Sequence, residues 1–228
     1  MNGEYSENTL ENAQDHSIFP RLRQGIYRFL GAWFLYPDQE ILDHIEPLVD
    51  YFRDQEDLLS ELPFYLEWQN LLIRLEKEKN KPLEQFEEEY MEIFGESGDF
   101  KPIPLMESAF LEKEGVPALL SELASLYNQA GVEMTFSGPS DHLTVELEFM
   151  SLLAGEEWEN REEKERIRNL LEVEYLFLRD HLSQWIPLLR KRVEFQSPKS
   201  IYLDFIKVLE GMIFFDMDYL IFLRENLG

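Results

Sequence analysis

The sequence contains no cysteine among its 228 residues. This absence excludes disulfide bonds, thiolate zinc sites, cysteine-ligated iron–sulfur clusters and cysteine nucleophiles. Basic residues are also scarce, because 21 Lys and Arg stand against 46 Asp and Glu and give a formal net charge of −25. Since a chain this negative repels phosphate backbones, we expect it not to bind nucleic acid.

The sequence also lacks any run of about 18 apolar residues, so no transmembrane segment is predicted. Residues 1–16 are polar and acidic, without the basic start and apolar stretch of a secretory signal. We therefore expect a cytoplasmic protein with a disordered acidic tail at 1–16. The hydrophobic share of 44% is too high for a wholly disordered acidic chain, so the negative charge is expected to cover a folded core.

Apolar residues recur with the helical period along most of the chain. Between residues 20 and 36 they lie on one helical face, which contains Leu22, Ile26, Phe29, Leu30 and Trp33. Similar patterns predict helices over 38–53 (capped by Asp38 and kinked at Pro47), 61–79, 82–94, 116–130, from 143 onward, over 160–184 and within 186–226. No stretch alternates as a half-exposed strand does. The sequence therefore predicts an all-α, single-domain bundle of about nine to eleven helices over residues 17–228.

One segment interrupts this pattern. Residues 95–106 contain two Gly and two Pro and form the longest irregular stretch inside the body of the chain. Loops of this kind often carry function. Together with residues 132–138, this loop can act as a hinge for exchange of elements between two copies, so a swapped homodimer is an open alternative.

The sequence offers little support for catalysis. His142 and Glu146 have the i, i+4 spacing of two metal ligands on a helix, but no third ligand can be named. A histidine at a helix start with a local hydrogen bond is the favoured interpretation. Asp141 and His142 are adjacent in the sequence, so their side chains do not face each other on a helix. The negative charge of Asp141 at the start of a helix is instead favourable with the helix dipole. Because nucleophile and phosphate-binding motifs are also absent, we expect no catalytic residues, metal or cofactor. A metal- or nucleotide-dependent enzyme is the alternative class.

The excess of carboxylates favours a binding function. Acidic runs such as 87–89 and 156–159 are individually typical of solvated helix faces. Taken together they describe a surface that attracts basic partners. An apolar groove rimmed by carboxylates would suit a peptide that carries arginines followed by an apolar stretch.

Three segments resemble, in order and spacing, the TorD/DmsD family of cytoplasmic chaperones for molybdenum-containing redox enzymes. They are Tyr90–Gly95, Pro104–Phe110 and Gly138–Leu143. The first two are similar to the family pattern of an aromatic, two residues, an aliphatic and Phe, followed by a Pro-containing loop that ends in Ser, a small residue and an aromatic. The third is similar to the family signature Glu-Pro-x-Asp-His. Two residues depart from the pattern: Gly138 replaces the usual Glu, and Met106 replaces a bulky aromatic.

The resemblance implies a redox enzyme maturation chaperone with a TorD-like helical domain. Such proteins bind the twin-arginine signal peptide of a cofactor-free catalytic subunit, hold it until the molybdopterin cofactor is inserted, and release it for export. Because related nitrate reductase chaperones share the superfamily, a chaperone for a non-exported molybdoenzyme subunit is the alternative. The residues that the resemblance implies for client binding are Tyr90, Ile93, Phe94, Pro104, Met106, Glu107, Ser108, Pro139, Asp141 and His142. Among them, Ile93 and Phe94 also fit core positions, and Asp141 and His142 are favoured for direct contact with a peptide.

Overall fold

The fold is known from a computed structural model that describes residues 19–96, 100–111, 115–131 and 138–226. Every regular secondary-structure element in these residues is a helix, which confirms the predicted all-α bundle. The acidic tail at 1–16 and parts of both predicted hinges, 97–99 and 132–137, lie outside the described residues, so the tail and the exchange of elements stay predictions. No described helix combines the length and the apolar character needed to cross a membrane.

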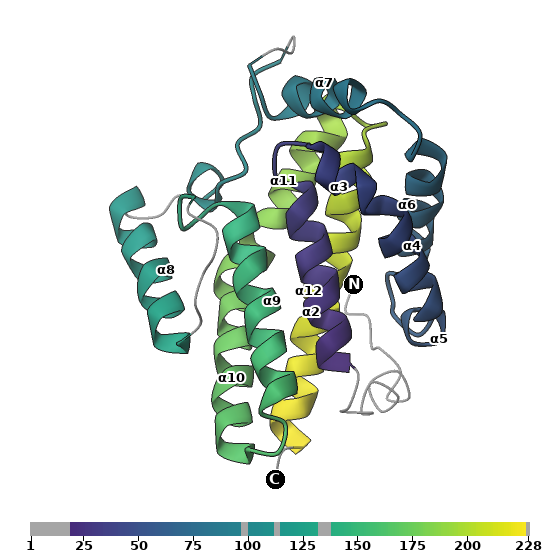
Figure 1. The fold of residues 1–228 in the computed structure, drawn as a ribbon. Coiled ribbons are helices and arrows are strands. Elements are labelled where there is room, and N and C mark those ends of the chain that lie inside the picture. The colour runs from purple at the N-terminus through teal and green to yellow at the C-terminus, as the bar shows by residue number, and fades with distance from the viewer. Residues whose placement is uncertain (1–18, 97–99, 112–114, 132–137, 227–228) are drawn as a thin grey trace.

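Long helices whose axes are nearly parallel or antiparallel to one another form the body of the molecule (Figure 1). They are α2 (Phe19–Trp33), α9 (Leu143–Glu159), α10 (Lys164–Phe177), α11 (Ser183–Gln196) and α12 (Ile201–Asn226). α2 packs along α9, while α12 packs against α6 (Tyr65–Glu78), α10 and α11. Since α12 contacts several helices, its buried residues are spread around the helix instead of along one stripe. The core is rich in aromatic contacts, such as the stacked rings of Trp33 and Phe205, whose centroids are 4.6 Å apart.

Shorter helices surround this body (Figure 1). α3 (Gln39–Asp43), α4 (Ile45–Asp54), α5 (Glu56–Leu59) and α6 lie on one side, α8 (Val116–Ala130) lies on the other, and α7 (Leu83–Ile93) lies across one end. Glu89 of α7 accepts hydrogen bonds from the Ser200 hydroxyl at 2.7 Å and from the Ile201 backbone N–H at 2.9 Å. These bonds attach α7 to the start of α12 and thereby position the segment that follows α7 at this end of the bundle.

The predicted helix over 38–53 is two helices. Asp38 caps α3 as predicted, because its carboxylate accepts a hydrogen bond from the Ile41 backbone N–H at 2.8 Å. The predicted kink at Pro47 is wrong, since the helix breaks at His44 and Pro47 lies in the first turn of α4. Proline is tolerated there because the first backbone N–H groups of a helix have no partner within the helix.

The predicted helix over 160–184 begins later and continues further. It starts at Lys164 and runs through a π-helical turn, η2 (Leu178–Leu182), directly into α11, which ends at Gln196. A π turn contains an extra residue, so the apolar residues after it no longer follow the 3.6-residue period of the residues before it. The sequence pattern therefore predicts that the helix ends near this turn, whereas the helix continues. The same turn directs His181 into the core, where it is fully buried.

Candidate functional site

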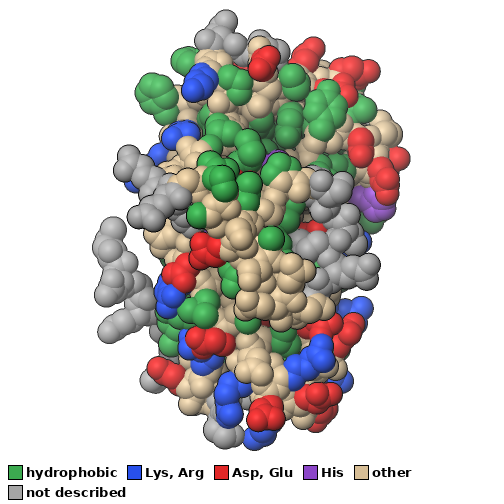
Figure 2. Space-filling view, turned by 90° about the vertical axis from the view of Figure 1, so that its left-hand side faces the viewer, with side chains coloured by type: hydrophobic (Ala, Val, Ile, Leu, Met, Phe, Trp, Pro, Cys, Tyr) green, Lys and Arg blue, Asp and Glu red, His purple; other side chains and the backbone are tan. Residues whose placement is uncertain are grey.

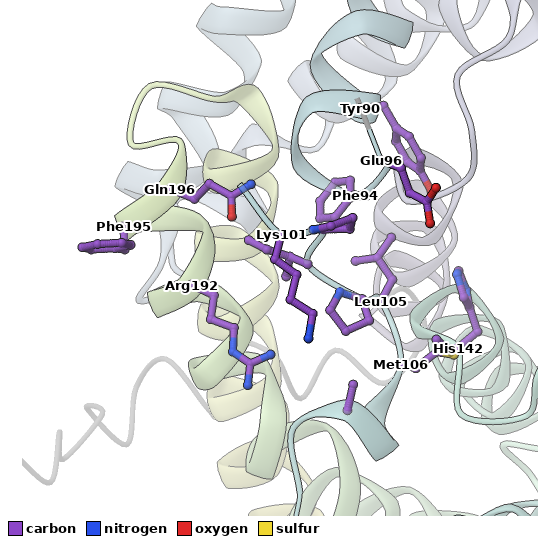
Figure 3. A pocket seen from close by; sticks show the side chains of 14 residues that line it. Tyr90, Phe94, Glu96, Lys101, Leu105, Met106, His142, Arg192, Phe195 and Gln196 are labelled. Atoms are coloured by element: carbon purple, nitrogen blue, oxygen red, sulfur yellow. The ribbon is translucent and has the colours of Figure 1, made fainter. Parts of the chain in front are cut away.

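A groove of about 890 Å³ lies at the α7 end of the bundle. Its walls are the end of α7, residues 101–106, the start of α9 and the last turns of α11. Figure 3 shows Arg192, Phe195 and Gln196 on one side of this groove and Met106 and His142 on the other. A cavity of this size accommodates a few side chains of a peptide or a small organic ligand. Five of the ten residues implied for client binding line it: Tyr90, Phe94, Pro104, Met106 and His142.

Two of the motif segments lie side by side at the groove. An isolated antiparallel bridge joins residues 104–108 to residues 139–143. The Leu143 backbone N–H donates to the Leu105 carbonyl at 2.9 Å, and the Glu107 N–H donates to the Asp141 carbonyl at 2.9 Å. The structure therefore brings together two stretches that are more than thirty residues apart in the sequence.

The third motif segment forms the end of α7. The Ile93 side chain is fully buried in the core, which is the alternative that the sequence left open for it. Its carbonyl accepts a hydrogen bond from the Ile103 N–H at 2.9 Å and so holds the far end of the irregular loop. Tyr90 and Phe94 are half-buried, and their ring centroids lie 5.1 Å apart. Phe94 also packs edge-on against Tyr202 of α12, so the aromatic wall of the groove is supported from behind.

The remaining implied residues do not line the groove. Asp141 is only 2% exposed, and its carboxylate accepts a hydrogen bond from the Ser108 backbone N–H at 3.2 Å. Ser108 lies in the short 3₁₀ turn η1 (Glu107–Ala109) and is half-buried. Glu107 is fully buried and hydrogen-bonded to Nδ1 of His181 at 2.9 Å, while Pro139 is exposed outside the lining. These contacts indicate that Asp141 and Glu107 hold η1 in place and do not contact a partner in the groove directly.

Replacing Asp141 by alanine should therefore act through η1. The change removes the acceptor of the partly buried Ser108 N–H, and we expect the free energy of unfolding to fall by about 1–3 kcal/mol, with weaker client binding as a second effect. Asp141→Asn keeps a side-chain oxygen that can accept the same hydrogen bond, so it should restore most of both properties. Urea unfolding and client titration of the two variants test this; equal losses in both would show that the negative charge itself is required.

His142 has two roles at the groove. It is the N-cap of α9, where its Nδ1 accepts a hydrogen bond from the Thr144 N–H at 3.2 Å, and its ring also lines the cavity. Burial lowers the pKa of His142, while the charge of Asp141 opposes this effect. With Nδ1 as the acceptor, a neutral ring carries its proton on Nε2. Glu146 lies one turn further but points into the core, so it does not share a site with His142. Within the described ranges, no three His, Cys, Asp or Glu residues are grouped as metal ligands would be.

Behind the groove lies a buried pair of carboxyl groups. Glu146 accepts a hydrogen bond from the Trp185 indole N–H at 3.0 Å. Burial, and next the charge of Glu107, raise the pKa of Glu146 well above its ordinary value. His181 and Trp185 complete this cluster from η2 and α11. No local pattern in the sequence indicates either residue, because both are far from the motif segments along the chain.

The sequence interpretation also missed one wall of the groove. Lys101, Arg192, Phe195 and Gln196 line it but belong to no quoted motif. The Arg192 guanidinium lies 4.2 Å from the centroid of the Phe110 ring. The spacing of Leu188, Arg192 and Phe195 (i, i+4, i+7), which places them on one helical face, was the available signal.

Figure 2 shows hydrophobic side chains gathered in the upper half of one face, at the α7 end, whereas many charged side chains lie in its lower half. The lining of the groove contains one carboxylate, on Glu96, and two basic groups, on Lys101 and Arg192. The groove therefore lacks the carboxylate rim suggested by the sequence. Its lining is locally basic within a strongly acidic chain.

These features define an all-α protein with an apolar, locally basic groove walled by three motif segments. The chain belongs to the nitrate reductase delta subunit family, whose model matches residues 40–191. This match confirms the sequence-based assignment to the wider family of molybdoenzyme maturation chaperones. It also corresponds to the nitrate reductase relatives that the sequence analysis gave as an alternative.

Two individual proteins are similar to this chain. A perchlorate reductase assembly chaperone protein of Dechloromonas aromatica (strain RCB) is 26% identical over 141 residues, which are 61% of this chain and 63% of that protein. The matched region thus spans less than two thirds of this relative. A crystal structure of a proposed redox enzyme maturation protein from Archaeoglobus fulgidus is 23% identical, with a TM-score of 0.49 over 83% of this chain and 93% of that chain.

Proposed function

We propose that this protein is a cytoplasmic assembly chaperone that binds the catalytic subunit of a molybdenum-containing reductase before the cofactor is inserted. The observation that carries the proposal is the groove, since all three motif segments contribute to its walls in a chain that belongs to this family. The relative described as a perchlorate reductase assembly chaperone supports the same class of client. The protein acts by binding and release, without a chemical step.

The groove suits an apolar segment of a client. Tyr90, Phe94 and Met106 present ring faces and a thioether to the cavity. Burying one large apolar side chain of a client against such a wall contributes about 1.5–3 kcal/mol. The wall is preformed because Phe94 packs on Tyr202, so little side-chain ordering is needed when the client binds. Release follows when the client buries the same apolar segment in its own folded structure.

Tyr90→Ala should weaken binding of the client about tenfold, because aromatic residues in partly buried pockets often dominate binding energy. The measurement is a calorimetric titration with the cofactor-free catalytic subunit of a molybdenum-containing reductase from the same organism. Tyr51→Ala is the matched control, since Tyr51 is an exposed tyrosine on α4 that does not line the groove. Equal affinities of the two variants, at unchanged thermal stability, would show that the client binds elsewhere.

We further propose that the apolar segment bound in the groove belongs to the twin-arginine signal peptide of this subunit, with the arginine pair outside the locally basic lining. The net charge of −25 supports this, because it attracts a cationic leader toward the protein. Titration with a leader peptide and with a copy in which both arginines are glutamine tests the proposal. The native peptide should bind more tightly, and the difference should shrink as salt screens the arginines. Equal binding at low salt would rule out recognition of the arginine pair.

The alternative is a client that is not exported and carries no leader. The match to the nitrate reductase delta subunit family favours it. A catalytic subunit whose leader has been removed distinguishes the two. If the shortened subunit still binds with the affinity of the intact one, and this binding is lost in Tyr90→Ala, the groove holds another apolar segment of the client.

A further inference from the structure

Two basic side chains of the groove form no ion pair with any residue that the structure describes. Lys101 and Arg192 both line the cavity, and Figure 3 shows Arg192 on one side of the groove and Lys101 between this side and that of Met106 and His142. Among the described residues, no carboxylate lies within ion-pair distance of either. By contrast Arg190, two residues before Arg192 on α11, pairs with both Glu194 and Glu210. Other described basic side chains, such as Lys77 and Lys199, also lie outside the ion pairs, but Lys101 and Arg192 are the Lys and Arg residues that line the groove, so their charge faces a bound partner.

Arg192 is also held in position by aromatic packing. Its guanidinium lies over the Phe110 ring at 4.2 Å, and the Phe110 centroid lies 5.3 Å from that of the buried Trp185. A guanidinium stacked on a ring leaves its in-plane N–H groups available for other acceptors. Arginine donates two such parallel hydrogen bonds to a carboxylate. Arg192 is therefore oriented for an anion before any partner arrives.

The surroundings of Arg192 are apolar on both sides. Leu188 lies one helical turn before it and Phe195 about one turn after it, on the same face of α11, with exposed fractions of 37% and 85%. A free phosphate would make no use of these apolar neighbours. A C-terminal carboxylate would use those on one side only, since the chain ends there. An acidic side chain inside an apolar segment uses both.

We propose that the groove recognises a client segment in which an Asp or Glu side chain lies between apolar residues. The carboxylate pairs with Arg192 and Lys101, and the apolar residues pack on Phe195, Leu188 and the aromatic wall. This rests on the proposed function and specifies the chemistry of the bound segment. It adds a basic anchor to a surface whose overall charge favours cationic partners.

The test uses overlapping peptides that cover the catalytic subunit of a molybdenum-containing reductase from the same organism, with amidated C-termini. Each peptide has a copy in which Asp and Glu are replaced by Asn and Gln, and a second copy in which they are replaced by Lys. The full-length protein is tested as wild type, as Arg192→Glu and as Lys191→Glu. Lys191 is the matched control, because it is exposed on the same helix but does not line the groove.

Bound peptides are expected to contain an acidic residue between apolar ones, and the amide copies should bind roughly tenfold more weakly. Arg192→Glu should no longer bind the native peptides and should bind the copies in which the acidic residues are replaced by lysine. Lys191→Glu should bind both sets of peptides as the wild type does. If binding depends on Tyr90 but not on the acidic residue or on Arg192, this inference fails and the proposed function stands. If no peptide or intact subunit binds, the proposed function fails. Displacement of bound peptide by micromolar inorganic pyrophosphate would indicate a phosphate site and overturn the inference.

Discussion

Replacing Arg23 by alanine is expected to lower the free energy of unfolding by about 3–5 kcal/mol. Arg23 is fully buried in the middle of the bundle. Its guanidinium bonds to Asp216, with Nε 2.5 Å from Oδ1, and forms ion pairs with Glu157 and Glu174. One side chain of α2 thus links α9, α10 and α12. Without it, three buried carboxyl groups lose their hydrogen-bond donor, and those that are ionised lose the cation that compensates their removal from water.

Urea unfolding at pH 7 measures this effect. Arg28→Ala is the matched control, because Arg28 lies on the same helix with an exposed side chain, and its removal should change stability by no more than about 0.5 kcal/mol. The comparison separates the loss of the buried cation from a general effect of arginine in α2. An unfolding midpoint of Arg23→Ala that equals that of Arg28→Ala would contradict the assigned role of the network.

The same network should make the protein less stable as the pH rises from about 5 to 8. Burial raises the pKa of Glu174 from 4.5 to about 8, although the charge of Arg23 opposes this shift. Between these two values the folded protein holds a proton that the unfolded chain has released, so each increase in pH favours unfolding. For one such group the free energy of unfolding falls by about 1.4 kcal/mol per pH unit, and the decline ends above the folded pKa. Salt-bridged carboxylates with lowered pKa values give the opposite trend.

Urea unfolding at several pH values between 5 and 8 tests the sign. Glu174→Gln removes the titrating group and should reduce the slope of the free energy of unfolding against pH by the contribution of about one proton. The contributions of Glu157 and Glu146 remain, because burial also raises the pKa values of these two groups. Glu172→Gln is the control, since Glu172 is partly exposed on the same helix and pairs with Arg224. A slope in Glu174→Gln that is as steep as in the wild type would exclude Glu174 as the source.

Helices with strong local end signals were predicted well. The predicted helix over 116–130 coincides with α8, because Gly115 precedes it and Gly131 ends it in the left-handed conformation, with φ of 71°. α7 was predicted within one residue at each end, since a proline precedes it and glycine follows shortly. These ends depend on residues that are neighbours in the sequence, so the sequence contains the information needed to place them.

Features that depend on distant contacts were not predicted. The π turn at Leu178–Leu182 accompanies the burial of His181 beside Glu107, a residue more than seventy positions away. The position of Arg192 likewise depends on Phe110, with which it shares no local pattern. The motif segments identified the region of the groove, but not which side chains face it. Asp141 is the clearest example, because a polar residue at a loop was expected to meet a partner, and its carboxylate is instead turned inward to Ser108.

The hydrogen bonds from Ser200 and Ile201 to Glu89 have a consequence for the groove. They make a side chain of α7 part of the cap of α12, the longest of the described helices. A client that levered α7 outward would remove this cap and expose the first turn of α12, at a cost of about 1 kcal/mol for the cap alone. Widening of the groove and fraying of the first turn of α12 are therefore coupled, and the Glu89 carboxylate transmits mechanical load on the client-binding end to the core alongside the packing of Phe94 on Tyr202.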